Sequence, residues 1–193
     1  MSMHGPIATH RSATGIPTGR LAVWWVLASE IFIFGGLIMC FVLFKLNGAP
    51  GFEDAAMTST AAGAFNTFVL LTSSLTIVLA HAASERGDTV ASFRYIWFTI
   101  FGGLIFMLVK VYEYTGKIIH GHTITENVFW SFYFTATGLH ALHVFGGMVI
   151  MAFISFDVRK NYNLHRVELI GIYWHFVDII WIFLFPLLYI ANF

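Results

Sequence analysis

A histidine and an aspartate lie one helical turn apart near the end of the chain, in the string YWHFVD at residues 173–178. Ionisable side chains are costly in hydrocarbon, so they need partners and usually serve a function. The i,i+3 spacing of His175 and Asp178 places both on one face of a helix and brings a direct hydrogen bond within reach. We therefore expect this pair to fix the last helix against its neighbours.

Glu30 lies deep in another apolar stretch, and the sequence places no cation within one helical turn of it. Desolvation disfavours a charged carboxylate, so we expect the protonated form at neutral pH unless a neighbouring helix supplies a charge. Two interpretations remain open. Glu30 is either a neutral carboxyl hydrogen-bonded across a helix crossing or part of a proton-exchange or gas path.

Two histidines, His140 and His143, lie three residues apart within FTATGLHALHVFGG. Histidines on a membrane helix raise the question of haem or copper ligation. A haem held by two histidines needs a second ligand on a facing helix, and His81 and His175 are both expected too near the cytoplasmic ends of their helices to serve. Hydrogen bonding between helices is the alternative interpretation. The sequence therefore predicts no metal site in this chain.

Three further ionisable residues lie within or next to the apolar stretches: Lys110, Glu113 and Arg159. Lys110 and Glu113 are spaced i,i+3 and can form an ion pair near a membrane interface, with the lysine stem extending outward. Arg159 belongs to a basic group that also contains Lys160 and Arg166. That group favours a defined orientation in the membrane, and it also suits contact with lipid phosphate.

The elements that must position these residues are membrane helices. Hydrophobic residues make up 58% of the chain and charged residues only 10%. A span needs about 20 mostly apolar residues, and five stretches satisfy this: residues 21–44, 61–83, 95–114, 128–156 and 171–193. We expect an all-α, five-helix transmembrane domain over residues 21–193, preceded by a cytoplasmic N-terminal segment, residues 1–20, that is not a removable signal.

Charge and composition exclude several other classes of protein. The net charge is zero, which gives no case for a nucleic-acid partner, and the single cysteine, Cys40, allows no disulfide within the chain. No metal, phosphate-loop or dinucleotide motif of soluble enzymes occurs. Nothing in the sequence therefore indicates catalysis of the soluble type.

The basic residues outside the spans predict the orientation. Seven of them fall on the side of the N-terminus and two on the other side. The positive-inside rule places the N-terminus in the cytoplasm and, with five spans, the C-terminus outside. Gly-Gly pairs at residues 35–36, 102–103 and 146–147 predict close helix crossings. The tryptophans expected at the membrane interfaces are Trp24, Trp25, Trp97, Trp130 and Trp174.

Strings in every span resemble subunit III of the haem-copper terminal oxidases. The last span carries YWHFVDIIWIFLF, the first carries ASEIFIF at residues 28–34, and the fourth carries ATGLHALHV at residues 136–144. Residues 65–81, 112–114, 123–129 and Glu168 follow the family order as well. Many members have seven spans, and this chain begins at the third.

The resemblance implies an accessory membrane subunit in a bacterial inner membrane. It implies that Glu30 corresponds to the carbodiimide-reactive glutamate of the family and Arg159 to its lipid-phosphate arginine. It also implies that oxidase subunit I, other oxidase subunits, phospholipids and a larger respiratory supercomplex are partners, with haem and copper in the catalytic subunit. The expected function is support of stability and proton uptake while the complex reduces dioxygen to water.

Other functions remain open at this point. A nitric oxide reductase companion shares the fold. A stand-alone proton or ion transporter would use Glu30, His140, His143, Lys110 and Glu113, but no inverted repeat is apparent in the sequence. A membrane cytochrome would retain haem when purified alone. The sequence leaves the electron donor, cytochrome c or a quinol, undecided.

Overall fold

The computed structural model describes residues 18–190, in which all the regular elements are helices. The expected segment of residues 1–20 lies outside this range except for its last three residues. The long helices are α1 (Thr18–Leu46), α2 (Thr60–Glu85), α3 (Thr89–Ile119), α4 (Val128–Arg159) and α5 (His165–Phe185). Two short segments, η2 (Phe52–Met57) and η3 (Pro186–Ile190), follow α1 and α5.

Five helices in the described part of the chain are long and apolar enough to cross a membrane. The shortest has 26 residues, and a helix of that length extends about 39 Å, more than the ~30 Å hydrocarbon core. The expected all-α, five-span fold class is therefore confirmed. Each observed helix begins at or before the first residue of the predicted apolar stretch. The reason is that polar first turns continue the backbone hydrogen bonding of the helix into the interface.

Three of the connections end at a polar residue that caps the next helix. The side chains of Ser59, Asp88 and Asn127 accept hydrogen bonds from the backbone N–H groups of Ala62, Ala91 and Trp130, respectively. Each cap satisfies a donor in the first helical turn that has no partner within the helix. These side chains therefore fix where α2, α3 and α4 begin.

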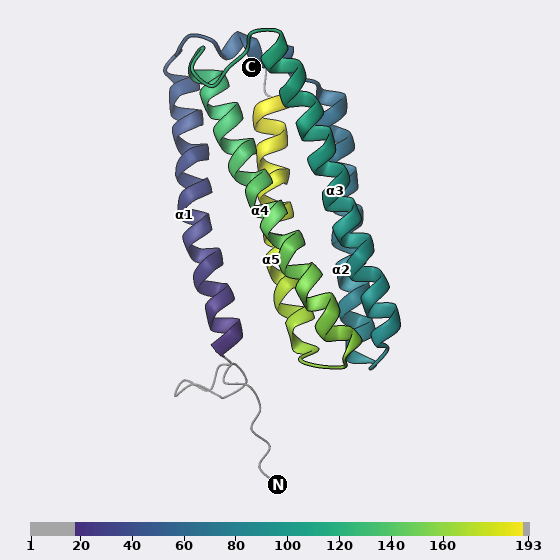
Figure 1. The fold of residues 1–193 in the computed structure, drawn as a ribbon. Helices are drawn as coiled ribbons and strands as arrows, with labels where there is room; N and C mark the ends of the chain where they lie inside the picture. Colours follow the sequence, from purple (N-terminus) through teal and green to yellow (C-terminus); the bar gives the residue numbers. More distant parts are fainter. Residues whose placement is uncertain (1–17, 191–193) are drawn as a thin grey trace.

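The helices run up and down across the bundle (Figure 1). We call the end where α1 begins the N-side and the end where α5 finishes the C-side. α2 packs most extensively against α3, and α5 contacts α1, α2 and α4. α1 stands at the edge of the bundle, where it contacts α4 and α5 (Figure 1). Much of the α1 surface is therefore left to lipid or to a partner.

The Gly-Gly pairs mark close helix contacts at only some of the expected positions. A Cβ atom on Gly102 would lie 2.8 Å from Ser73 Cβ, and one on Gly103 would lie 2.7 Å from Met148 Sδ. A Cβ on Gly147 would approach the Trp174 ring to 3.0 Å. The prediction is wrong for residues 35–36 and for residue 146, where a Cβ would meet no atom within 4 Å.

The fifth span begins earlier than the apolar pattern predicted, at His165 rather than near residue 171. As a result, His175 lies about 15 Å along the helix and is not at its N-side end. Trp174, expected at an interface, is fully buried and donates to Ser73 Oγ at 3.0 Å. Trp130 is also fully buried, whereas Trp24, Trp25 and Trp97 are exposed as predicted.

Candidate functional site

Glu30 on α1 faces His143 on α4, with Oε2 and Nε2 3.0 Å apart. The contact has ion-pair distance, although the two groups are not aligned as a hydrogen bond. His143 Nδ1 lies 2.8 Å from the Leu139 carbonyl oxygen, so Nδ1 must carry a proton because a carbonyl only accepts. Nε2 and the Glu30 carboxyl therefore compete for one proton, whichever of them holds it.

The partner of Glu30 thus comes from a neighbouring helix, as the sequence left open. Tyr173 on α5 donates to the His143 backbone carbonyl at 3.2 Å, and Phe34 packs edge-on against the imidazole at 5.4 Å between ring centroids. These contacts hold the histidine from three helices. The pair lies near mid-span at the edge of the bundle, because α1 is the outermost helix.

His140 has a different environment from His143. Its side chain is fully buried, stacked on Trp181 at 5.2 Å between ring centroids and in edge contact with Phe106 at 5.4 Å. Neither ring nitrogen has a hydrogen-bond partner in the part of the chain that the structure describes. The two histidines therefore do not act as one unit, and the expected interhelical hydrogen bond exists for neither His140 nitrogen.

Residues 18–190 contain no group of three or more histidines, cysteines, aspartates or glutamates close enough to hold a metal ion. His81 lies 3.7 Å from Glu85 on its own helix, and His175 contacts α2. Neither is placed to complete a ligand set with His140. The in-span histidines instead pack against aromatic rings or pair with polar groups.

Lys110 and Glu113 form a buried ion pair, not the interfacial pair that the sequence predicted. Lys110 Nζ donates to Glu113 Oε2 at 2.9 Å, and the two residues are only 3% and 7% exposed. Lys110 also bonds the hydroxyl of Tyr189, which donates to Glu113 Oε2 at 3.2 Å and lies 3.0 Å from the Tyr133 hydroxyl. The expected interfacial position is wrong because η3 places Tyr189 over the lysine and blocks its path outward.

The aromatic rings around Lys110 complete its environment. Nζ lies 4.7 Å from the centroid of a Trp181 ring and 4.9 Å from that of Tyr189. Cation–π attraction of this kind is strongest where water is absent. Spacing could not reveal Tyr189 or Trp181 as partners, since they lie 79 and 71 positions away along the chain. The only feature of the sequence that could have pointed to these two residues is the polar atom that each carries on an aromatic side chain within a span.

His175 and Asp178 do not bond each other. His175 Nδ1 lies 2.6 Å from Ser74 Oγ on α2, and neither oxygen of Asp178 has a hydrogen-bond partner among the described residues. Asp178 is 3% exposed, and its carboxyl also interacts with Ser74 of α2 without meeting hydrogen-bond geometry. The expected direct hydrogen bond is therefore wrong, and the contact that joins α5 to α2 at this level is the one between His175 and Ser74.

Arg159 and Lys160 are the exposed members of the basic group on the N-side. Of these two, Arg159 is the one that the family resemblance singles out. Its guanidinium carbon lies 5.3 Å from the centroid of the Phe93 ring, and no carboxylate of the described residues lies within ion-pair distance. Arg166 differs, because its Nη1 is 2.7 Å from Asp157 Oδ2. Arg20 bonds Glu168 in the same region. Arg159 therefore keeps its charge available for an external anion.

These features define a class of protein: a multi-span helical membrane subunit whose buried ionisable groups mostly pair with one another. Residues 7–192 match the model of the family described as Cytochrome c oxidase subunit III. The chain belongs to the cytochrome c oxidase subunit III family, which confirms the resemblance seen in the sequence. It is accordingly an accessory subunit of a haem-copper oxidase, and the stand-alone transporter is not favoured.

Individual relatives agree with this assignment. Cytochrome c oxidase subunit 3 of Thermostichus vulcanus is 33% identical over 171 residues, covering 86% of this chain and 84% of the relative. The subunit 3 of Bacillus sp. strain PS3 is 30% identical over 194 residues and covers 97% and 93%, respectively. A protein of Aeropyrum pernix named heme-copper oxidase subunit I+III is 28% identical over 183 residues, which are 89% of this chain and 22% of that protein.

Proposed function

We propose that this chain packs against subunit I of a terminal oxidase that reduces dioxygen to water, and that it supports the stability and proton uptake of that subunit without a redox centre of its own. The fused I+III relative supports the association, because one polypeptide there carries both names. Haem and copper belong to the catalytic subunit in this proposal. Other oxidase subunits and a larger respiratory supercomplex are further expected partners.

The observation that carries the proton-related part is the pairing of Glu30 with His143. Glu30 Oε2 and His143 Nε2 lie 3.0 Å apart, and the two side chains are 13% and 17% exposed at the edge of the bundle. A buried ionisable pair that remains reachable is suited to exchange a proton with a neighbouring surface. In this proposal, that surface belongs to subunit I, which lies against α1 and α4.

Changing Glu30 to glutamine should remove an infrared signal of a protonated carboxyl from the oxidase complex and slow its proton uptake during turnover. Glutamine keeps the shape and can still bond the imidazole, but it cannot release a proton. The measurement combines infrared difference spectra with proton uptake and oxygen consumption. Glu53→Gln, an exposed carboxyl on η2, is the matched control.

Two outcomes would argue against this role for Glu30. One is an unchanged rate of proton uptake in Glu30→Gln with the subunit still bound. The other is an infrared difference spectrum of Glu30→Gln that matches that of the wild type in the carboxyl region. A Glu30→Leu complex that loses the subunit altogether would separate a packing role from proton exchange.

Arg159 is proposed to bind a lipid phosphate at the N-side interface. Its support is its exposure and the lack of a carboxylate partner among the described residues, in contrast to Arg166. Basic side chains at head-group level are attracted to anionic lipids by about 1 kcal/mol each.

The proposed orientation has the N-side in the cytoplasm of a bacterial cell and the C-side outside the inner membrane. Arg20, Arg86, Arg94, Arg159, Lys160 and Arg166 all lie at N-side helix ends, which the positive-inside rule assigns to the cytoplasm. Reporter fusions at the two termini should give opposite signals, cytoplasmic at the N-terminus and external at the C-terminus. A cytoplasmic signal at both ends would contradict this orientation.

A further inference from the structure

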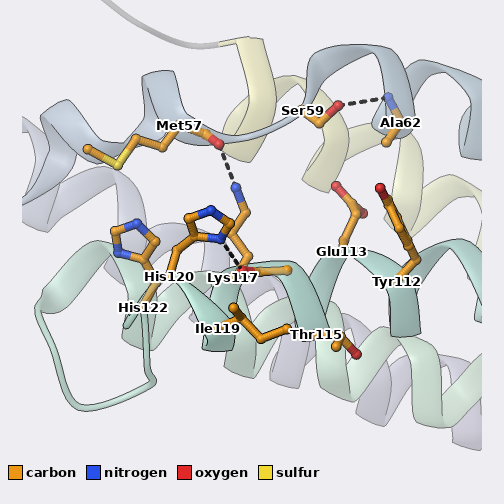
Figure 2. A pocket seen from close by; sticks show the side chains of 11 residues that line it. Met57, Ser59, Ala62, Tyr112, Glu113, Thr115, Lys117, Ile119, His120 and His122 are labelled. Atoms are coloured by element: carbon orange, nitrogen blue, oxygen red, sulfur yellow. Dashed lines mark hydrogen bonds between the residues drawn. The ribbon is translucent and has the colours of Figure 1, made fainter.

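A pocket of about 550 Å³ opens at the C-side, between the start of α2, the end of α3 and the segment that carries η2. Two histidines that are separated by one glycine, His120 and His122, line it together with Met57 of η2. Figure 2 shows both imidazoles and the Met57 thioether on the same side of this pocket. Two nitrogen ligands and one sulfur ligand, from two connections outside the spans, therefore lie around one space.

The hydrogen bonds of the two imidazoles decide which nitrogen is free to bind a metal. His120 Nδ1 lies 2.7 Å from the Gly116 carbonyl oxygen, and His122 Nδ1 lies 3.0 Å from Glu126 Oε2. A carbonyl and a carboxylate only accept, so each Nδ1 carries the proton and each Nε2 of the neutral rings keeps its lone pair. This is the arrangement of metal-bound histidines, whose second nitrogen almost always donates to a carbonyl or a carboxylate.

His122 is held in place by an aromatic ring as well. Its imidazole stacks on Trp130, with the ring centroids 4.6 Å apart and the planes 22° apart. The Trp130 ring is in turn fixed, because its Nε1 donates to Asp54 Oδ2 at 3.0 Å. Binding to a ring that is already positioned costs little conformational entropy.

Met57 is the soft member of the ligand set. Its side chain is 55% exposed, and its backbone carbonyl accepts a hydrogen bond from Lys117 Nζ, which ties η2 to the end of α3. Glu126 is not a third ligand, because its carboxylate is engaged by His122 Nδ1 and the described residues hold no metal-binding group of histidines and carboxylates alone. Thioether sulfur with imidazole nitrogen favours monovalent copper, Cu⁺, over harder cations.

Lys117 also bears on the charge of the ion. It lines the pocket, and no ion pair among the described residues includes it. Two neutral imidazoles and a thioether bring no negative charge to offset a cation. Repulsion from the ammonium group is twice as large for a divalent ion as for a monovalent ion at the same distance, so the site disfavours Zn²⁺ relative to Cu⁺.

We propose that His120, His122 and Met57 bind one Cu⁺ ion at the C-side, through the two Nε2 atoms and the Met57 Sδ. The sequence predicted no metal in this chain, because ligands were sought within the spans and Met57 lies on a distant connection. The ion is held at the surface and is not a redox centre. The inference therefore does not rest on the function proposed above.

The test uses the whole oxidase complex, dialysed against a chelator under reducing conditions and then titrated with Cu⁺ in competition with a chromophoric Cu⁺ chelator. Wild-type complex should take up one equivalent of Cu⁺ in addition to the copper that remains after dialysis. Glu126→Leu removes only the acceptor of His122 Nδ1 and should weaken this binding by about 10- to 100-fold. His120→Gln and His122→Gln, which remove a ligand, should weaken it at least as much.

X-ray absorption at the copper edge supplies a readout that depends on the ligand atoms themselves. The added copper should show a sulfur neighbour in the wild type and none in Met57→Leu. Met39→Leu, at a 60% exposed methionine of α1, and His165→Gln, at the exposed N-side start of α5, are the matched controls and should bind Cu⁺ like the wild type. Zn²⁺ should bind more weakly than Cu⁺, and it should gain more than Cu⁺ from Lys117→Met.

Several results would overturn the proposal. One is a wild-type complex that takes up no further equivalent of Cu⁺, and another is an affinity unchanged in both His120→Gln and His122→Gln. Zn²⁺ bound as tightly as Cu⁺ would contradict the assignment of a soft monovalent ion. Loss of the added copper in His165→Gln or Met39→Leu, with His120→Gln unaffected, would place the ion elsewhere.

Discussion

Lys110→Met should destabilise the subunit by about 3 to 5 kcal/mol, the range for removing one partner of a buried ion pair. The substitution leaves Glu113 without its cation at a position that is only 7% exposed. Tyr189 still donates one hydrogen bond to the carboxylate, but one neutral donor does not compensate for a buried charge. Thermal unfolding and retention of the subunit through detergent washing of the complex would measure the loss.

The double variant Lys110→Met/Glu113→Leu should recover much of this stability, because it removes both charges together. Lys160→Met, at an exposed helix end, is the control and should change stability by less than about 0.5 kcal/mol. If Lys110→Met alone were as stable as the wild type, Glu113 would have to be neutral in the folded subunit. The description of this site as an ion pair would then be wrong.

The spans could be predicted from sequence because membrane insertion depends on length and apolar content, which are local properties. The residue identities in the candidate site were also visible, since ionisable groups such as Glu30 and Lys110 stand out in an apolar run. Their partners were not visible. Which side chain meets which depends on the rotation and register of neighbouring helices, and apolar periodicity is weak where lipid surrounds the bundle.

One mistaken position and one mistaken pairing illustrate this limit. Lys110 was expected to reach the interface because its stem is long, but the η3 segment places Tyr189 over it. His175 was expected to bond Asp178 because they share a helix face, but Ser74 on α2 lies within 2.6 Å of the imidazole. For His175 the contact with α2 replaces the expected contact within α5, whereas Lys110 keeps its contact with Glu113 and gains Tyr189 as a further partner.

His175→Phe should weaken the attachment of α5 to α2 by about 1 kcal/mol, the lower end of the cost of leaving a polar group without its partner, because the contact is only part-buried. The lost contact is the one between His175 Nδ1 and Ser74 Oγ at 2.6 Å. Because the subunit is an accessory one, the initial rate of oxygen reduction should be retained, and activity should decline faster during sustained turnover as the subunit dissociates. Initial rate, activity after many turnovers and subunit retention are the three measurements.

Asp178→Asn should behave differently, because an amide oxygen can still accept from Ser74, the α2 hydroxyl that interacts with the Asp178 carboxyl. The amide has nearly the same shape and cannot ionise, so durability close to that of the wild type is expected. Ser74→Ala should match His175→Phe, and the two combined should cost no more than either alone, since they break one contact. If Asp178→Asn lost activity in turnover while Ser74→Ala did not, the carboxyl itself would be the functional group, and the assigned role of the contact between His175 and Ser74 would be wrong.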